Sequence, residues 1–141
     1  MQFLDTNILL YANSSEPADR EKATIADALL HKTDIALSVQ VLQEFYVQAT
    51  RASRPKRMLH DEAQGLIQSW LRFKVQEMTV DILMAALNCS QRYQISYWDA
   101  AIIESARKLG CREVLSEDLN DGQSYSGIHV VNPFRSRNRK S

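Results

Sequence analysis

Four acidic residues stand where carboxylates can act together on one ligand: Asp5, Glu44, Asp99 and Asp118. Asp5 ends the short apolar run Phe3-Leu4, and Asp118 comes soon after another, Val114-Leu115. In open α/β sheets, ligands bind just outside the carboxyl ends of the strands. Carboxylates collected there, without a matching set of Lys or Arg residues, suit oxygen coordination of Mg²⁺ or Mn²⁺.

The rest of the sequence supplies elements that can position these acids. Short strands are predicted at Gln2–Asp5, Ile35–Leu37, Val75–Met78, Val114–Leu115 and His129–Val131. Helices are predicted from near Ile8, over Ala18–Lys32, after Ser38, over Leu59–Leu71, from Thr79 to about Tyr93, and from Ser96 through Leu109. This alternation predicts an α/β fold, a three-layer α/β/α sandwich around a mostly parallel sheet of about five strands.

Each acid also has a purely structural alternative. Asp5 suits the cap of the first helix, and Asp99 follows Ser96 at a spacing close to that of a capping box. Asp118 lies in a segment, residues 116–122, whose composition is that of a turn. Glu44 lies on the side of its helix away from Leu42, which is either a solvated face or a polar face turned toward a cleft.

Polar groups beside the acids are candidates for orienting a carboxylate or a water molecule: Thr6, Asn7 and Ser116. The alternative for these three is simple helix or turn capping, and we assign Thr6-Asn7 as capping groups of the first helix. Asp121 is a candidate additional acid or a turn residue. The sequence alone leaves these alternatives open.

A basic cluster separates the helix that carries Glu44 from the next one: Arg51, Arg54, Lys56 and Arg57. These side chains are candidate contacts for the phosphates of a nucleic acid, or else they place favourable charge at a helix C-terminus. A second basic segment lies at the end of the chain and contains Arg135, Arg137, Arg139 and Lys140. It is a phosphate-binding tail or a solvated terminus.

Length and composition predict one domain over residues 1–134, followed by the basic tail, residues 135–141. The net charge of zero divides into −4 for the domain, with 13 basic and 17 acidic residues, and +4 for the tail. No apolar run approaches the ~18 residues of a membrane span, and no signal peptide is recognisable. The two cysteines are expected to be free thiols, so we expect a cytoplasmic protein without a membrane partner.

Other chemistries lack essential parts in this sequence. The three histidines are scattered, without the spacing of metal ligands. The glycine-rich loops that hold nucleotides are absent, and so is the G-x-S-x-G elbow of serine hydrolases.

The order and spacing of the acids resemble those of PIN-domain proteins. The resemblance rests on five segments: FLDTNILLYA at 3–12, Ser38 to Glu44, YWDAAII at 97–103, SEDL at 116–119, and VNPF at 131–134. It covers about residues 1–134, and the size of the chain is similar to that of VapC-type toxins of toxin–antitoxin pairs. Asp118, rather than its neighbours Glu117 and Asp121, matches the family position.

This resemblance implies a metal-dependent endoribonuclease that hydrolyses single-stranded RNA. It implies that Asp5, Glu44, Asp99 and Asp118 are catalytic and hold Mg²⁺ or Mn²⁺. It also implies a cognate antitoxin protein and a homodimer, for which Tyr11, Tyr46 and Trp70 are candidate interface residues. The alternatives are a non-catalytic module that binds RNA or protein and an RNA-processing nuclease without an antitoxin. The presence of all four acids favours the enzyme.

Overall fold

The computed structural model describes residues 1–135, which form an α/β fold around a six-stranded sheet. The strands are β1 (Gln2–Leu4), β2 (Ile35–Ser38), β3 (Lys74–Gln76), β4 (Glu113–Leu115), β5 (Ser124–Tyr125) and β6 (Ile128–Val131). Their order across the sheet is β3-β2-β1-β4-β6-β5. All neighbouring pairs are parallel except β5 and β6, so the prediction of a mostly parallel sheet is confirmed.

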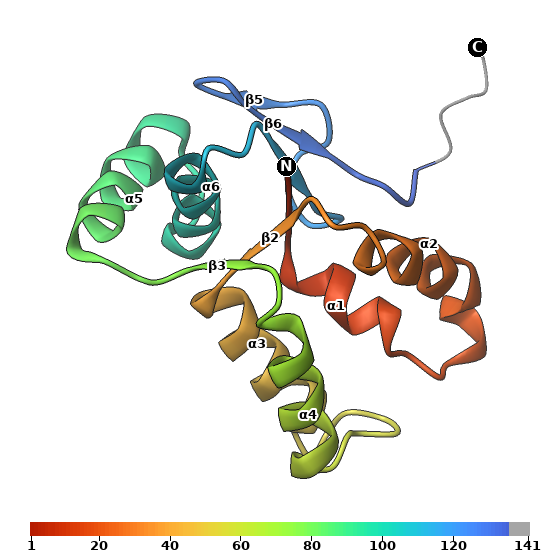
Figure 1. Ribbon diagram of the computed structural model, residues 1–141. Helices are drawn as coiled ribbons and strands as arrows, with labels where there is room; N and C mark the ends of the chain where they lie inside the picture. The colour runs from red at the N-terminus through yellow and green to blue at the C-terminus, as the bar shows by residue number, and fades with distance from the viewer. Residues whose placement is uncertain (136–141) are drawn as a thin grey trace.

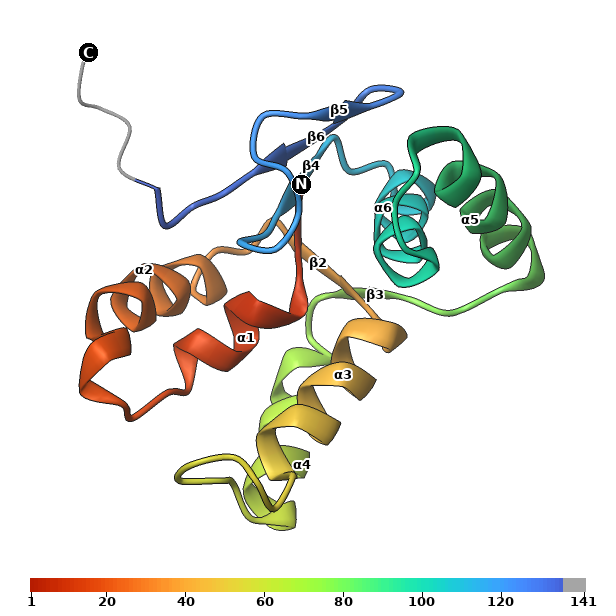
Figure 2. The ribbon, with the colours of Figure 1, turned by 180° about the vertical axis from the view of Figure 1, so that it is seen from behind.

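Helices cover both faces of the sheet, as the predicted three-layer sandwich requires. The helices are α1 (Thr6–Ala12), α2 (Arg20–Leu30), α3 (Val39–Thr50), α4 (His60–Trp70), α5 (Val80–Tyr93) and α6 (Tyr97–Leu109), with a short 3₁₀ helix at Pro17–Asp19. Figures 1 and 2 show α1 and α2 on one side of the sheet and α5 and α6 on the other. Helices α3 and α4 lie side by side beyond these layers.

Local signals place the helix ends where the sequence predicts them. Ser38, Thr79 and Ser96 each accept a hydrogen bond from a backbone N–H in the first turn of the following helix. Gly110 ends α6 with a φ of 87°, a left-handed conformation that glycine adopts without strain. The first helix begins two residues earlier than predicted, because the carboxylate of Asp5 accepts from the Thr6 N–H. The capping role assigned to Thr6-Asn7 therefore belongs to Asp5.

One strand was not predicted. Strand β5 contains two residues and pairs with β6 across a hairpin whose central residues are Ser126 and Gly127. Both have positive φ, 52° and 96°, which is the pattern of a type I′ turn that matches the twist of antiparallel strands. A segment this short has no hydrophobic period, so only its Ser-Gly turn could have indicated it.

The core lies between the sheet and both helix layers, and Trp70 belongs to it. Its indole is 3% exposed and packs edge-to-face on Phe45, with ring centroids 4.8 Å apart. Cys89 and Cys111 are buried, free cysteines, as predicted. No helix in the described chain is long and apolar enough to cross a membrane. Of the predicted basic tail, Arg137, Arg139 and Lys140 lie outside the described residues.

Candidate active site

The site begins where β1 and β4 end side by side. Leu4 is in register with Leu115, so the next residues, Asp5 and Ser116, are neighbours at the carboxyl edge of the sheet. The Ser116 hydroxyl donates to Asp5 Oδ2 over 2.6 Å, and the Thr6 N–H donates to Asp5 Oδ1 over 2.7 Å. The side chain of Asp5 is thus fixed by both the loop after β4 and its own helix start.

Helix α1 connects Asp5 to two other acids through its first turn. The Thr6 hydroxyl donates to Glu44 Oε1 on α3 over 2.6 Å. The Asn7 amide donates to Asp118 Oδ2 over 3.1 Å and, more weakly, to Asp5 Oδ2 over 3.4 Å. Thr6 and Asn7 therefore donate hydrogen bonds to three of the four carboxylates.

Helix α6 brings Asp99 to the same region. Asp99 lies in the first turn of α6, where its N–H donates to the Ser96 hydroxyl. Gln40 links this turn to α3, because its Nε2 donates to the Trp98 carbonyl over 3.1 Å and to Glu44 Oε2 over 3.2 Å. The amide of Gln40 is buried, and its Oε1 has no hydrogen-bond partner in the described structure. A buried oxygen without a hydrogen-bond partner costs free energy of folding. Gln40 therefore contributes through its two donated hydrogen bonds, to Glu44 and to the Trp98 carbonyl.

The four acids share one electrostatic environment. Burial raises the pKa of Asp5 to about 6, against the hydrogen bonds from Ser116 and Thr6, and the charges of Asp118 and Glu44 raise it further. Burial also raises the pKa of Asp99, opposed by Ser96 and reinforced by Asp118 and Glu44. Across residues 1–135, no basic side chain forms an ion pair with any of the four. The site therefore holds uncompensated negative charge.

These acids fit a hydrated divalent cation better than a fully protein-bound one. Among the described residues, no three His, Cys, Asp or Glu side chains converge into a ready-made metal cage. Mg²⁺ does not need such a cage, since it keeps several waters and takes only one or two carboxylates. The donors are carboxylates, amides and hydroxyls, which suit Mg²⁺ and Mn²⁺.

A fifth carboxylate beside the site is already neutralised. Glu117 Oε1 accepts from the Tyr11 hydroxyl over 2.5 Å, and Glu117 Oε2 pairs with Lys22 on α2. Although burial opposes it, hydrogen bonding to Lys22 and Tyr11 lowers the pKa of Glu117 below its ordinary value. Lys22 also lies 4.9 Å from the centre of the Tyr11 ring. Glu117 thus stabilises the packing of α2, and no sequence pattern predicts this pairing.

Asp121, the candidate additional acid, is engaged elsewhere. Its Oδ1 accepts from the Asn132 N–H over 2.8 Å, and its Oδ2 pairs with Arg135 over 3.0 Å. These contacts fasten the segment after β6 to the loop after β4. The described contacts therefore place Asp121 in a structural role next to the site.

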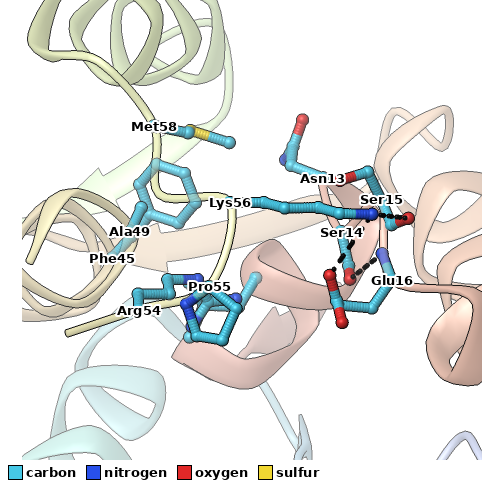
Figure 3. Close-up of a pocket in the computed structure, with 11 residues that line it drawn as sticks. Asn13, Ser14, Ser15, Glu16, Phe45, Ala49, Arg54, Pro55, Lys56 and Met58 are labelled. Atoms are coloured by element: carbon cyan, nitrogen blue, oxygen red, sulfur yellow. Dashed lines mark hydrogen bonds and ion pairs between the residues drawn. The ribbon is translucent and has the colours of Figure 1, made fainter. Parts of the chain in front are cut away.

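The predicted basic cluster lies at the C-terminal end of α3. Arg57 donates to the carbonyl of Thr50, in the last turn of α3. Lys56 crosses a small hollow to reach the Ser15 carbonyl and the Glu16 carboxylate, at 3.4 and 3.5 Å, as Figure 3 shows. Arg51 and Arg57 are exposed, and Arg54 lines the hollow. The cluster is accessible, but it does not touch the acids.

The chain matches the family model of the PIN domain over residues 3–120. It belongs to the PIN domain family. This match spans all four acids, from Asp5 to Asp118. No curated protein shows a significant sequence match to the chain.

Several solved structures share the fold over most of the chain. A chain of a toxin–antitoxin complex from Klebsiella pneumoniae is 23% identical, with a TM-score of 0.66, and the alignment covers 94% of this chain and 98% of that one. FitAcB from Neisseria gonorrhoeae gives 21% identity, a TM-score of 0.67 and coverages of 95% and 99%. VapC20 from Mycobacterium tuberculosis is described as a Sarcin-Ricin loop cleaving toxin. It is 18% identical, with a TM-score of 0.64, and the alignment covers 84% of this chain and 92% of that one.

Proposed function

We propose that this PIN-domain protein is a metal-dependent endoribonuclease that hydrolyses phosphodiester bonds of single-stranded RNA in the cytoplasm. The observation that carries the proposal is the meeting of Asp5, Glu44, Asp99 and Asp118 at one edge of the sheet without a basic partner. Uncompensated carboxylates are costly to bury, and a divalent cation offsets that cost. The description of VapC20 as a Sarcin-Ricin loop cleaving toxin supports a cleavage reaction here.

In this proposal each acid has a position suited to its role. A bound Mg²⁺ or Mn²⁺ supplies an activated water and neutralises charge on the phosphate. Asp5 is buried and fixed by Thr6 and Ser116, so it provides the rigid anchor of the site. Asp118 is exposed and Asp99 is half-buried, so these carboxylates face the entering strand. Thr6 and Gln40 orient Glu44 from two sides.

Cleavage is expected to require the cation. The purified protein should cut a single-stranded RNA in Mg²⁺ or Mn²⁺ and should lose this activity in EDTA, because the carboxylates alone cannot neutralise the phosphate. Gel analysis of a labelled oligonucleotide, followed by restoration with excess Mn²⁺, measures both steps. Activity that persists after exhaustive chelation contradicts the proposal.

The same assay tests the non-catalytic module, and the neighbouring gene tests the RNA-processing nuclease. A non-catalytic module would bind RNA in the presence of Mg²⁺ without cutting it. An RNA-processing nuclease would cut, but it would have no inhibitor encoded beside it. All four acids are present, which supports a working enzyme over the module.

The protein is further proposed to be the toxin of a VapC-type toxin–antitoxin pair. The Klebsiella relative is described as part of a toxin–antitoxin complex, which supports an antitoxin partner here. Such inhibitors are often flexible segments that fold on binding and lay an apolar face into a groove. The hollow in Figure 3 has apolar walls from Phe45 of α3 and from Met58 in the loop before α4. Leu10 of α1 also lines it.

A homodimer is the proposed assembly, and α5 supplies its interface. Four exposed apolar residues repeat at helical spacing along α5: Val80, Leu83, Met84 and Leu87. An unpaired apolar stripe of this kind marks an association surface. The interface residues expected from the sequence do not form such a stripe. Trp70 is buried, Tyr11 hydrogen-bonds to Glu117, and Tyr46 hydrogen-bonds to His60.

Met84→Glu is expected to convert the dimer to a monomer, because it places a charge in the middle of the apolar stripe. Met84 is 55% exposed, so the substitution should leave the fold intact. Light scattering of both proteins at high concentration gives the mass. Leu59→Glu is the matched control, because Leu59 is 66% exposed at the start of α4 and lies outside the stripe. A wild-type monomer, or a dimer that survives Met84→Glu, rules out this interface.

A further inference from the structure

The residue before Asp99 presents a large aromatic ring to solvent. Trp98 is 62% exposed, whereas the other tryptophan, Trp70, is 3% exposed. Exposing an indole forgoes the favourable burial of a large apolar surface. Its neighbour Asp99 is one of the four acids, so the exposed ring stands at the edge of the candidate active site.

Two contacts involve the residue that carries this ring. Tyr97 packs against it in a T-shaped arrangement, with centroids 5.0 Å apart and planes at 80°. Whichever ring presents its edge, at least one face of the indole stays clear of Tyr97. The Trp98 carbonyl accepts from Gln40, which also donates to Glu44. The backbone that carries the indole is therefore tied to the acids themselves.

Trp98 does not belong to the apolar stripe of α5. The stripe runs from Val80 to Leu87, and Leu87 lies six residues before Tyr93, which is about 9 Å along the helix axis. Trp98 lies at the opposite end of the α5–α6 hairpin, beyond the connection that follows Tyr93. Asp99 follows it in the sequence, and Tyr97, which precedes it, packs against the ring. The indole therefore lies next to one acid of the site and outside the apolar stripe of α5.

Because the site is negatively charged, RNA binding there needs a contribution that does not depend on phosphate charge, such as base stacking. Four uncompensated acids repel the phosphates of an approaching strand, so electrostatic attraction to the backbone is weak there. Stacking of a base on an aromatic ring does not depend on phosphate charge and is tolerant of sequence. We infer that Trp98 is a stacking platform that binds a nucleobase of single-stranded RNA beside the phosphate to be cut. This inference rests on the proposed ribonuclease function and names a positioning residue for it.

Binding of RNA to inactive protein tests the inference directly. In an Asp5→Asn background with Mg²⁺, titration of a single-stranded oligoribonucleotide should quench tryptophan fluorescence, and the exposed Trp98 should carry the change. Trp98→Ala should raise the Kd about 10-fold or more, as for other base-stacking aromatic residues. Trp98→Phe keeps an aromatic face and should retain most of the affinity. Thermal melts establish that each variant is folded, as the exposure of Trp98 leads one to expect.

Salt dependence distinguishes stacking from phosphate binding. Trp98→Ala should weaken binding equally at low and high salt, whereas Arg54→Ala, if it removes a phosphate contact, should reduce the slope of log K against log salt. The inference is overturned if Trp98→Ala binds RNA like its parent, if no RNA binding is detected, or if the substitution instead converts a dimer to a monomer. RNA binding that depends on Trp98, without any cleavage by the wild type, upholds the stacking platform and rejects the nuclease.

Discussion

Asp5→Asn is expected to lower RNA cleavage by at least about 100-fold, the usual cost of removing a group that stabilises charge in a reaction. The carboxylate lies between the Ser116 hydroxyl and the Thr6 N–H, where an amide of the same shape fits. The substitution removes the negative charge while keeping the volume of the side chain. Cleavage rates of wild type and variant on the same RNA, at equal Mg²⁺, give the ratio.

The same substitution is expected to leave the metal-free protein as stable as the wild type, or more stable. The pKa of Asp5 is about 6 in the folded protein and ordinarily 3.8, so between these values the folded state binds more protons than the unfolded state. The free energy of unfolding therefore falls as the pH rises through this window, and ionised Asp5 costs about 3 kcal/mol at pH 7. Asparagine avoids this cost but loses part of the hydrogen bonding to Ser116 and Asn7.

Urea unfolding in EDTA at several pH values measures the effect. The difference in stability between Asp5→Asn and wild type should be largest above pH 6 and should shrink as the pH falls toward 4, where Asp5 is protonated in the wild type as well. Asp61→Asn, an exposed aspartate of α4, is the matched control and should change neither cleavage nor this pH dependence. A large loss of stability in Asp5→Asn at every pH would mean that capping of α1 is the main role of Asp5.

Local sequence signals accounted for most of the fold. The helix starts after Ser38, Thr79 and Ser96 depend on one side chain and one N–H three residues later, so spacing alone reveals them. The meeting of Asp5 with Ser116 follows from parallel pairing, once each is assigned to a strand end. Strand β5 was not predicted, because a segment of two residues has no hydrophobic periodicity.

The contacts that the sequence could not predict are those between distant segments. Lys22 and Glu117 are 95 residues apart, and Gln40 and the Trp98 carbonyl are 58 apart. The charge and polarity of these residues are visible in the sequence, and Gln40 shares a helical face with Glu44. Their partners depend on how α2, α3 and α6 pack on the sheet. The exposure of Trp98 also depends on how the helices pack, since the sequence alone does not show whether an apolar residue at a helix start is buried.

Expression of this chain alone is expected to stop bacterial growth, and co-expression of its antitoxin is expected to restore it. A cytoplasmic ribonuclease harms its own cell unless an inhibitor binds it tightly. The acids offer such an inhibitor a clear target, because a Lys or Arg side chain inserted among Asp5, Glu44 and Asp99 would supply the positive charge that the described protein lacks. The inserted Lys or Arg side chain would exclude both the metal ion and the RNA from the site.

Colony counts after induction give the measurement, with the chain expressed alone, with the neighbouring gene, and as Asp5→Asn. The active chain alone should reduce colonies by orders of magnitude, and both other cultures should grow normally. Rescue by Asp5→Asn ties toxicity to the acids rather than to overproduction of a foreign protein. Co-purification of the neighbouring gene product with the chain, at salt low enough to preserve ion pairs, identifies the inhibitor. Normal growth with abundant folded wild-type protein would contradict the toxin, and cleavage of RNA by that protein would then decide between the non-catalytic module and the RNA-processing nuclease.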